Sequence, residues 1–238
     1  MLFAAAICLL TSAAANAQSY AITNAKIVTV SGVTIDKGTV VIRNGLIDSV
    51  GATVTPPADA TVIDAGGATV YPGLIDTLTN LGIPARPTTA GGPGGQTAAA
   101  ATPVSNSNYP AGLRPEDMTE NEIRAGDSQF EASRNVGFTA ALTTGRTGIF
   151  SGQSAVINLA GDSVSAIVIK SPFAQHVSFV TIGGGVYPGS LLGTFSALRQ
   201  IFNDAKRLQE NQRAYAADPR GMKRPAGDRS LEALFPAI

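Results

Sequence analysis

Asn44 and Gly45 stand between two apolar runs, TVVIR and LIDSVG, and this pair strongly constrains the N-terminal fold. Both residues tolerate positive backbone φ angles, so an Asn-Gly pair between strands is typical of a two-residue hairpin turn. The runs YAITNAKIVTV, ATVIDA and ATVYPG are also strand-like and bounded by turn residues. We therefore expect residues 20–71 to form a small, mostly antiparallel sheet. The side chains expected to face inward are Ile27, Val41, Ile47 and Val62.

A helix followed by a strand is predicted in DSQFEASRNVGFTAALTTG, where Gly137 is placed to end the helix and residues 138–142 form a buried strand. This order favours a parallel sheet. SAVINLAG, SAIVIKSP and HVSFVTIG read as further strands, and DRSLEALFPAI begins a helix. The helix predicted over 194–215 has one apolar side, so we expect it to cover the outside of a sheet. That side consists of Leu198, Ile201, Phe202, Ala205 and Leu208.

Residues 83–115 are rich in Gly, Pro, Ala, Thr and Ser and contain few large apolar side chains. Such a composition does not offset the entropy of ordering a chain. We therefore expect a low-complexity loop over 83–115, with ordered structure before and after it.

The first 17 residues, MLFAAAICLLTSAAANA, form an apolar run that ends in Ala15-Asn16-Ala17. This pattern is typical of a secretory signal peptide, with a buried N-terminal helix as the alternative. We expect 1–17 to be removed and the mature chain to be exported, either periplasmic or secreted. The run is shorter than the about 20 residues of a membrane span, and no later run is long and apolar enough for one. Cys8 lies inside it, so the mature chain would have no disulfide.

The 17 basic and 17 acidic residues give a net charge of zero, and no basic run stands out. Nucleic acid and anionic membrane surfaces are therefore not expected as partners.

The hairpin VVIRNGLIDSVG, the run VIDAGGATVYPGLID and the change to helix–strand order together resemble the amidohydrolase superfamily, particularly its imidazolonepropionase-like branch. The resemblance is strong over about 22–76 and moderate over about 131–216. It implies α/β architecture, in which 18–71 form part of a β-sandwich and 72–238 form part of a (β/α)8, TIM-like barrel. It also implies one or two divalent metal ions such as zinc, whose hydroxide attacks a carbon–nitrogen bond of a small-molecule substrate.

In that family the first barrel strand ends in Pro-Gly-Leu/Phe-Ile-Asp, one further residue, and then His-x-His, which supplies two metal ligands. Here PGLID is present, and the two ligand positions hold Leu78 and Asn80. Leu78 has no donor atom, and a neutral amide is a poor zinc ligand compared with imidazole. We therefore expect this chain to bind no metal.

Three residues are weak site candidates. Asp76 keeps the family identity, and we favour a hydrogen bond to backbone at the strand end over acid–base catalysis. Lys170 ends SAIVIK, where a bridging carboxylated lysine is the functional hypothesis and an exposed strand-end lysine the structural one. His176 is the single histidine, and one imidazole is more often structural than a metal ligand. Asp64 is expected to act as a turn residue before Gly66.

Two other motifs are rejected. Ser154 is followed by Ala155 and Val156, so FSGQSAV lacks the G-x-S-x-G pattern of serine hydrolases. GGGVYPG places Pro188 where a dinucleotide-binding loop needs glycine.

A complete (β/α)8 barrel takes about 250 residues. Only 167 follow from Pro72 to Ile238, so we expect a partial barrel and a truncated or incompletely recorded chain. Three hypotheses follow. The chain is the N-terminal, catalytically incomplete part of an exported hydrolase acting on non-peptide carbon–nitrogen bonds, or a non-catalytic exported binding or partner subunit on the same scaffold. The third hypothesis is an independent β-rich binding module. The VYPGLID junction between the two parts of the chain argues against it. A homo-oligomer is compatible with each.

Overall fold

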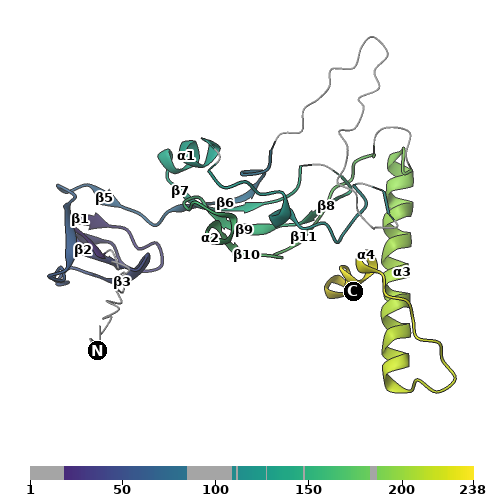
Figure 1. Cartoon of the computed structure of the whole chain (residues 1–238). Coiled ribbons are helices and arrows are strands. Elements are labelled where there is room, and N and C mark those ends of the chain that lie inside the picture. Colours follow the sequence, from purple (N-terminus) through teal and green to yellow (C-terminus); the bar gives the residue numbers. More distant parts are fainter. Residues whose placement is uncertain (1–18, 85–108, 111, 127, 147, 183–186) are drawn as a thin grey trace, which may run out of the picture. The chain divides into compact units, whose positions relative to one another are not determined.

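The computed structural model describes residues 19–84, 109–110, 112–126, 128–146, 148–182 and 187–238. The expected signal peptide and most of the expected loop over 83–115 lie outside the described residues. The chain separates into two compact units, the first ending at Pro72 and the second beginning at Gly73. Figure 1 gives the order of the elements.

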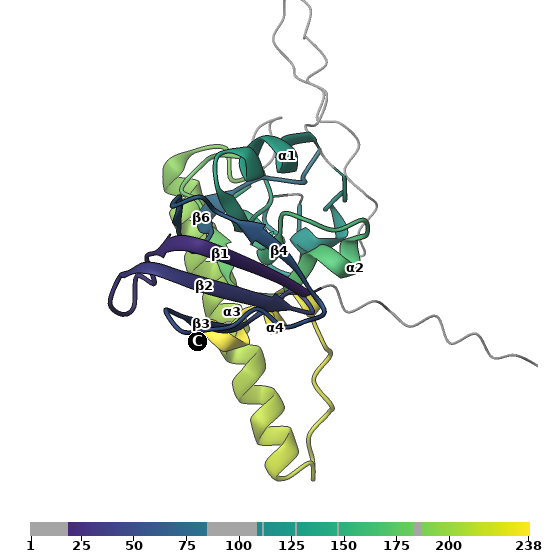
Figure 2. The ribbon, with the colours of Figure 1, turned by 90° about the vertical axis from the view of Figure 1, so that its left-hand side faces the viewer.

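The first unit contains one sheet in its described part, with strand order β3-β2-β1-β4 and β5 also paired to β1. Its strands are β1 (Ser19–Ile27), β2 (Ile35–Arg43), β3 (Leu46–Gly51), β4 (Ala60–Asp64) and β5 (Thr69–Val70). Figure 2 shows β1, β2 and β3 side by side. The hairpin between β2 and β3 is confirmed, because Asn44 and Gly45 have φ angles of 54° and 75° and Arg43 pairs with Leu46.

The sheet is mixed, which corrects the expected, mostly antiparallel arrangement. Strands β2 and β3 run antiparallel to their neighbours, whereas β4 and β5 run parallel to β1. The physical reason is the connection after β3, which carries the chain from one edge of the sheet to the other before β4 begins.

In this sheet, side chains on the central strands are more buried than those on the edge strands. Ile27 and Val41 are buried as predicted, and Ile27 packs with Ala25 and Val40. The prediction for Ile47 and Val62 is wrong, because their side chains are 67% and 56% exposed. Both residues lie on edge strands, β3 and β4, where a single neighbouring strand gives little cover. Among the described residues of this unit there is no second sheet, so the expected sandwich stays a prediction.

The second unit contains a four-stranded sheet of order β10-β9-β7-β6 and a two-stranded sheet of β8 and β11. Its strands are β6 (Leu74–Thr79), β7 (Phe138–Thr143), β8 (Phe150–Gln153), β9 (Ala155–Asn158), β10 (Val168–Lys170) and β11 (Gln175–Val177). The expected parallel pairing holds for β6 and β7, but β9 runs antiparallel to both β7 and β10. No sheet closes into a barrel among the described strands.

Two short helices pack on the four-stranded sheet. Helix α1 (Ser128–Asn135) ends before Gly137, whose φ of 98° and hydrogen bond to the Arg134 carbonyl confirm the predicted helix end. Helix α2 (Val164–Ile167) takes up the first three residues of SAIVIKSP, so only 168–170 of this run form the predicted strand, β10. The Ser163 hydroxyl accepts a hydrogen bond from the Ala166 amide and thereby stabilises this helical turn. Phe130 of α1 and Ile167 of α2 share one buried cluster with Ile157 of β9.

The long helix α3 (Leu191–Ala217) extends the predicted helix at both ends. Leu198, Ile201 and Ala205 are buried as its apolar pattern predicts. They pack with Phe150 of β8 and with Leu234, which follows the short helix α4 (Arg229–Glu232). Helix α3 therefore packs against the start of β8 and against the C-terminal segment. Figure 1 shows α4 beside α3.

Two 3-10 helices, η1 (Thr119–Asn121) and η2 (Phe235–Ala237), complete the described elements. Within the part of the chain that the structure describes, no helix has both the length and the apolar character needed to cross a membrane.

Candidate functional site

The candidate site lies on the C-terminal half of β6, which pairs in parallel with β7. Asp76 and Leu78 belong to this strand, and Asn80 follows it directly. We call this region the β6 edge. An Asp76 carboxylate oxygen accepts a hydrogen bond of 3.2 Å from the Leu78 backbone amide. This contact is the backbone role expected for Asp76. The acid–base role of Asp76 stays a prediction.

Asn80 uses its side-chain amide to join the two strand ends. Its Nδ2 atom donates hydrogen bonds to the carbonyl oxygens of Thr144, at 2.7 Å, and Gly145, at 3.4 Å. The Thr144 backbone amide donates to the Thr79 carbonyl at 2.9 Å. The N–H groups of the Asn80 side chain are therefore already used within the protein.

Two further side chains tie the same segments together. The Thr143 hydroxyl donates to the Leu81 carbonyl at 2.8 Å. The Arg146 guanidinium donates to the Ile83 carbonyl, with Nη2 at 2.6 Å and Nε at 3.1 Å, and Nη2 also lies 3.4 Å from the Asn80 carbonyl oxygen. We call Asn80, Thr143 and Arg146 the β6–β7 clip.

The sequence interpretation did not identify the clip. Its signal is the run TTGRTG, which starts at the last residue of β7 and combines short polar residues with one arginine. Which carbonyls these side chains reach depends on contacts between residues 62 and 64 positions apart, and no local pattern encodes them.

Leu78 precedes the clip and is 64% exposed. The pairing of β6 with β7 is irregular between Asp76 and Thr79, so Leu78 lies in a bulged part of the strand. The residue at the first expected ligand position is therefore an exposed apolar side chain and not part of the described core.

Lys170 does not join this edge. It ends β10, and β9 lies between β10 and β7. The Lys170 ammonium lies 5.7 Å from the ring centre of Phe173, a distance typical of a cation–π contact. The bridging-lysine hypothesis stays a prediction.

His176 lies on β11 of the two-stranded sheet, away from β6 in the strand order. Its Nε2 atom is buried and has no hydrogen-bond partner within the described residues. Burial lowers the pKa of the His176 imidazole, which favours the neutral form. Asp76, Lys170 and His176 thus lie on three different strands, and the structure brings no two of them together in a described contact.

Asp64 has the predicted turn role. An oxygen of its carboxylate accepts hydrogen bonds from the Gly66 backbone amide, at 2.9 Å, and from the Asn24 side chain, at 3.1 Å. These two contacts lower the pKa of the Asp64 carboxyl, the Gly66 amide contributing most.

Comparison with known proteins rests on the fold. No family model matches this chain, and no curated protein matches it. A solved structure of an amidohydrolase from Thermotoga maritima superimposes with a TM-score of 0.68 and 18% sequence identity, over 90% of this chain and 54% of that chain. The chain has an amidohydrolase-like fold. It spans about half the length of the solved amidohydrolase.

The β6 edge of this amidohydrolase-like fold does not fit a zinc ion. Leu78 offers no donor atom, and the Asn80 amide points its N–H groups at two backbone carbonyls. Within the described residues there is no group of three His, Cys, Asp or Glu side chains that could hold a metal ion. Arg146, the charged residue of the clip, is a cation and would repel a metal ion.

Proposed function

We propose that this chain is an exported amidohydrolase-type protein of the imidazolonepropionase-like branch, related to hydrolases of non-peptide carbon–nitrogen bonds in small molecules, and that it is catalytically incomplete. The observation that carries the second half of this proposal is the hydrogen bond from Asn80 to the Thr144 carbonyl. It orients the Asn80 side chain through its N–H group, and the remaining neutral amide oxygen is a poor zinc ligand compared with imidazole. No step of the reaction is assigned to a metal at this edge.

The test is a hydrolysis assay of the purified chain with simple cyclic imides, with and without added zinc. We expect the same rate as the buffer control in both conditions. A zinc-dependent rate above the control, abolished by Asp76→Asn and unchanged by the exposed control Asp162→Asn, would contradict the proposal.

A non-catalytic binding or partner subunit is the second candidate. The observation that favours it is that two apolar side chains of β6, Ile75 and Leu78, are 63% and 64% exposed. An inactive chain that elutes as a stable homo-oligomer, and that becomes monomeric when Leu78 and Ile75 are replaced by Ser, would support this candidate. A monomer at all concentrations would oppose the homo-oligomer.

A further inference from the structure

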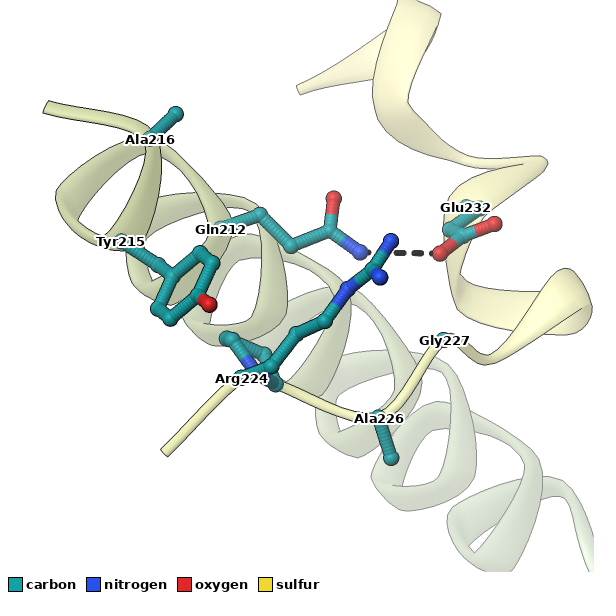
Figure 3. A pocket seen from close by; sticks show the side chains of 8 residues that line it. Gln212, Tyr215, Ala216, Arg224, Ala226, Gly227 and Glu232 are labelled. Atoms are coloured by element: carbon teal, nitrogen blue, oxygen red, sulfur yellow. Dashed lines mark hydrogen bonds between the residues drawn. The ribbon is translucent and has the colours of Figure 1, made fainter. Parts of the chain in front are cut away.

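A hollow of about 810 Å³ lies between the C-terminal part of α3 and the chain that returns from α3 to α4 (Figure 3). All of its walls belong to the second unit, and none of its residues belongs to the β6 edge. The walls combine polar and apolar side chains, which is typical of small-molecule sites.

Two residues of opposite charge, Arg224 and Glu232, contribute to the walls. Figure 3 shows the side chains of Arg224 and Gln212 both extending toward Glu232. Gln212 Nε2 donates a hydrogen bond of 2.8 Å to Glu232 Oε1, which holds the carboxylate from the α3 side. Among the described residues, Arg224 has neither an ion pair nor a hydrogen bond, so its guanidinium donors remain accessible.

The backbone beside the carboxylate is also open. A Cβ atom at Gly227 would lie 3.2 Å from Glu232 Oε1, closer than most such contacts. A larger residue at this position would therefore crowd the carboxylate, which glycine does not. The half-buried ring of Tyr215 and the neighbouring Pro225 supply the apolar surface.

We propose that this hollow binds a small zwitterion, such as a free amino acid or a dipeptide. The Arg224 guanidinium donates two parallel hydrogen bonds to the ligand carboxylate, a geometry that arginine favours. The Glu232 carboxylate accepts hydrogen bonds from the ligand ammonium, while Gln212 keeps it in place. The Tyr215 ring contacts the apolar part of the ligand. This site is independent of any hydrolysis at the β6 edge.

The test uses calorimetric titration of the full chain with three matched probes. Glycyl-tyrosine carries both charges, N-acetylglycyl-tyrosine lacks the ammonium group, and glycyl-tyrosinamide lacks the carboxylate. We expect glycyl-tyrosine to bind with a Kd of about 1 mM or below, and each blocked peptide to bind about tenfold more weakly. Equal binding of all three peptides, or no saturable binding of glycyl-tyrosine, would overturn the proposal.

Variants locate the site. Arg224→Gln and Glu232→Gln should each weaken glycyl-tyrosine binding about tenfold, and Arg224→Lys should weaken it less, because it keeps the charge and loses the fork. Arg213→Gln is the matched control, since Arg213 is exposed on α3 and does not line the hollow. If Arg213→Gln weakened glycyl-tyrosine binding as much as Arg224→Gln, the peptide would bind outside this hollow. If a variant does not fold, the comparison of the three peptides on the unmodified protein decides alone.

Discussion

The side-chain amide of Asn80 donates a 2.7 Å hydrogen bond to the backbone carbonyl of Thr144, 64 residues later in the chain. This contact joins the ends of two parallel strands at an expected metal-ligand position. The carbonyls that it serves are partly buried, so they depend on this donor more than exposed groups would.

Replacing Asn80 by alanine should lower the free energy of unfolding by about 1–3 kcal/mol, because it leaves partly buried carbonyl groups without their donor. Urea unfolding followed by circular dichroism measures this change. Asn203→Ala is the control, since Asn203 is exposed on α3 and should change stability by no more than about 0.5 kcal/mol. Equal effects of the two replacements would mean that the Asn80 contact contributes nothing specific.

The clip should behave as a unit. Arg146 donates to the Ile83 and Asn80 carbonyls, so it orders the loop that Asn80 anchors. We expect Arg146→Ala and Asn80→Ala to be non-additive, with a coupling of about 0.5–3 kcal/mol in a double-mutant cycle. Strict additivity would show that the two side chains act on the loop separately.

Histidine should be tolerated differently at the two expected ligand positions. Leu78→His changes a side chain that is 64% exposed and should alter stability by no more than about 0.5 kcal/mol. Asn80→His removes the clip donor and should cost about as much as Asn80→Ala. Ile157→Ala is the reference for a core residue, since Ile157 is fully buried and its truncation should lower the free energy of unfolding by about 2–5 kcal/mol. A core-sized loss for Leu78→His would mean that Leu78 packs against part of the protein outside the described residues.

Stability should fall on mild acidification through His176. Burial lowers the pKa of the folded imidazole, so the unfolded chain takes up a proton first as pH drops below about 6.5. Above that pH both states are neutral, and the contribution of His176 to stability is constant. Thermal unfolding of the protein between about pH 8 and pH 5 should therefore show a steeper loss than that of His176→Gln. Identical slopes would rule out His176 as the titrating group.

Local signals predicted several elements of the fold. Asn44 and Gly45 encode the hairpin through their own backbone preferences, and Gly137 encodes the end of α1 in the same way. The apolar spacing of α3 is also local, which explains why its buried side was predictable. These features depend on neighbours within a few residues.

Long-range pairing was less predictable. The exposure of Ile47 and Val62 depends on which strands become sheet edges, and β9 runs antiparallel to β7 for reasons that no local pattern contains. The absence of ligands at Leu78 and Asn80 was readable from the residue types. The β6–β7 clip could not be predicted, because the contacts of Asn80 and Arg146 depend on how two distant segments of the chain are aligned.

The zinc content of the purified chain after dialysis tests the central claim most directly. Tight zinc binding requires several converging ligands, and the described residues offer no such group. Elemental analysis should find far less than one equivalent of zinc per chain, with or without prior incubation in zinc. About one tightly held equivalent would contradict the account and make Asp76, Lys170 and His176 the first residues to replace.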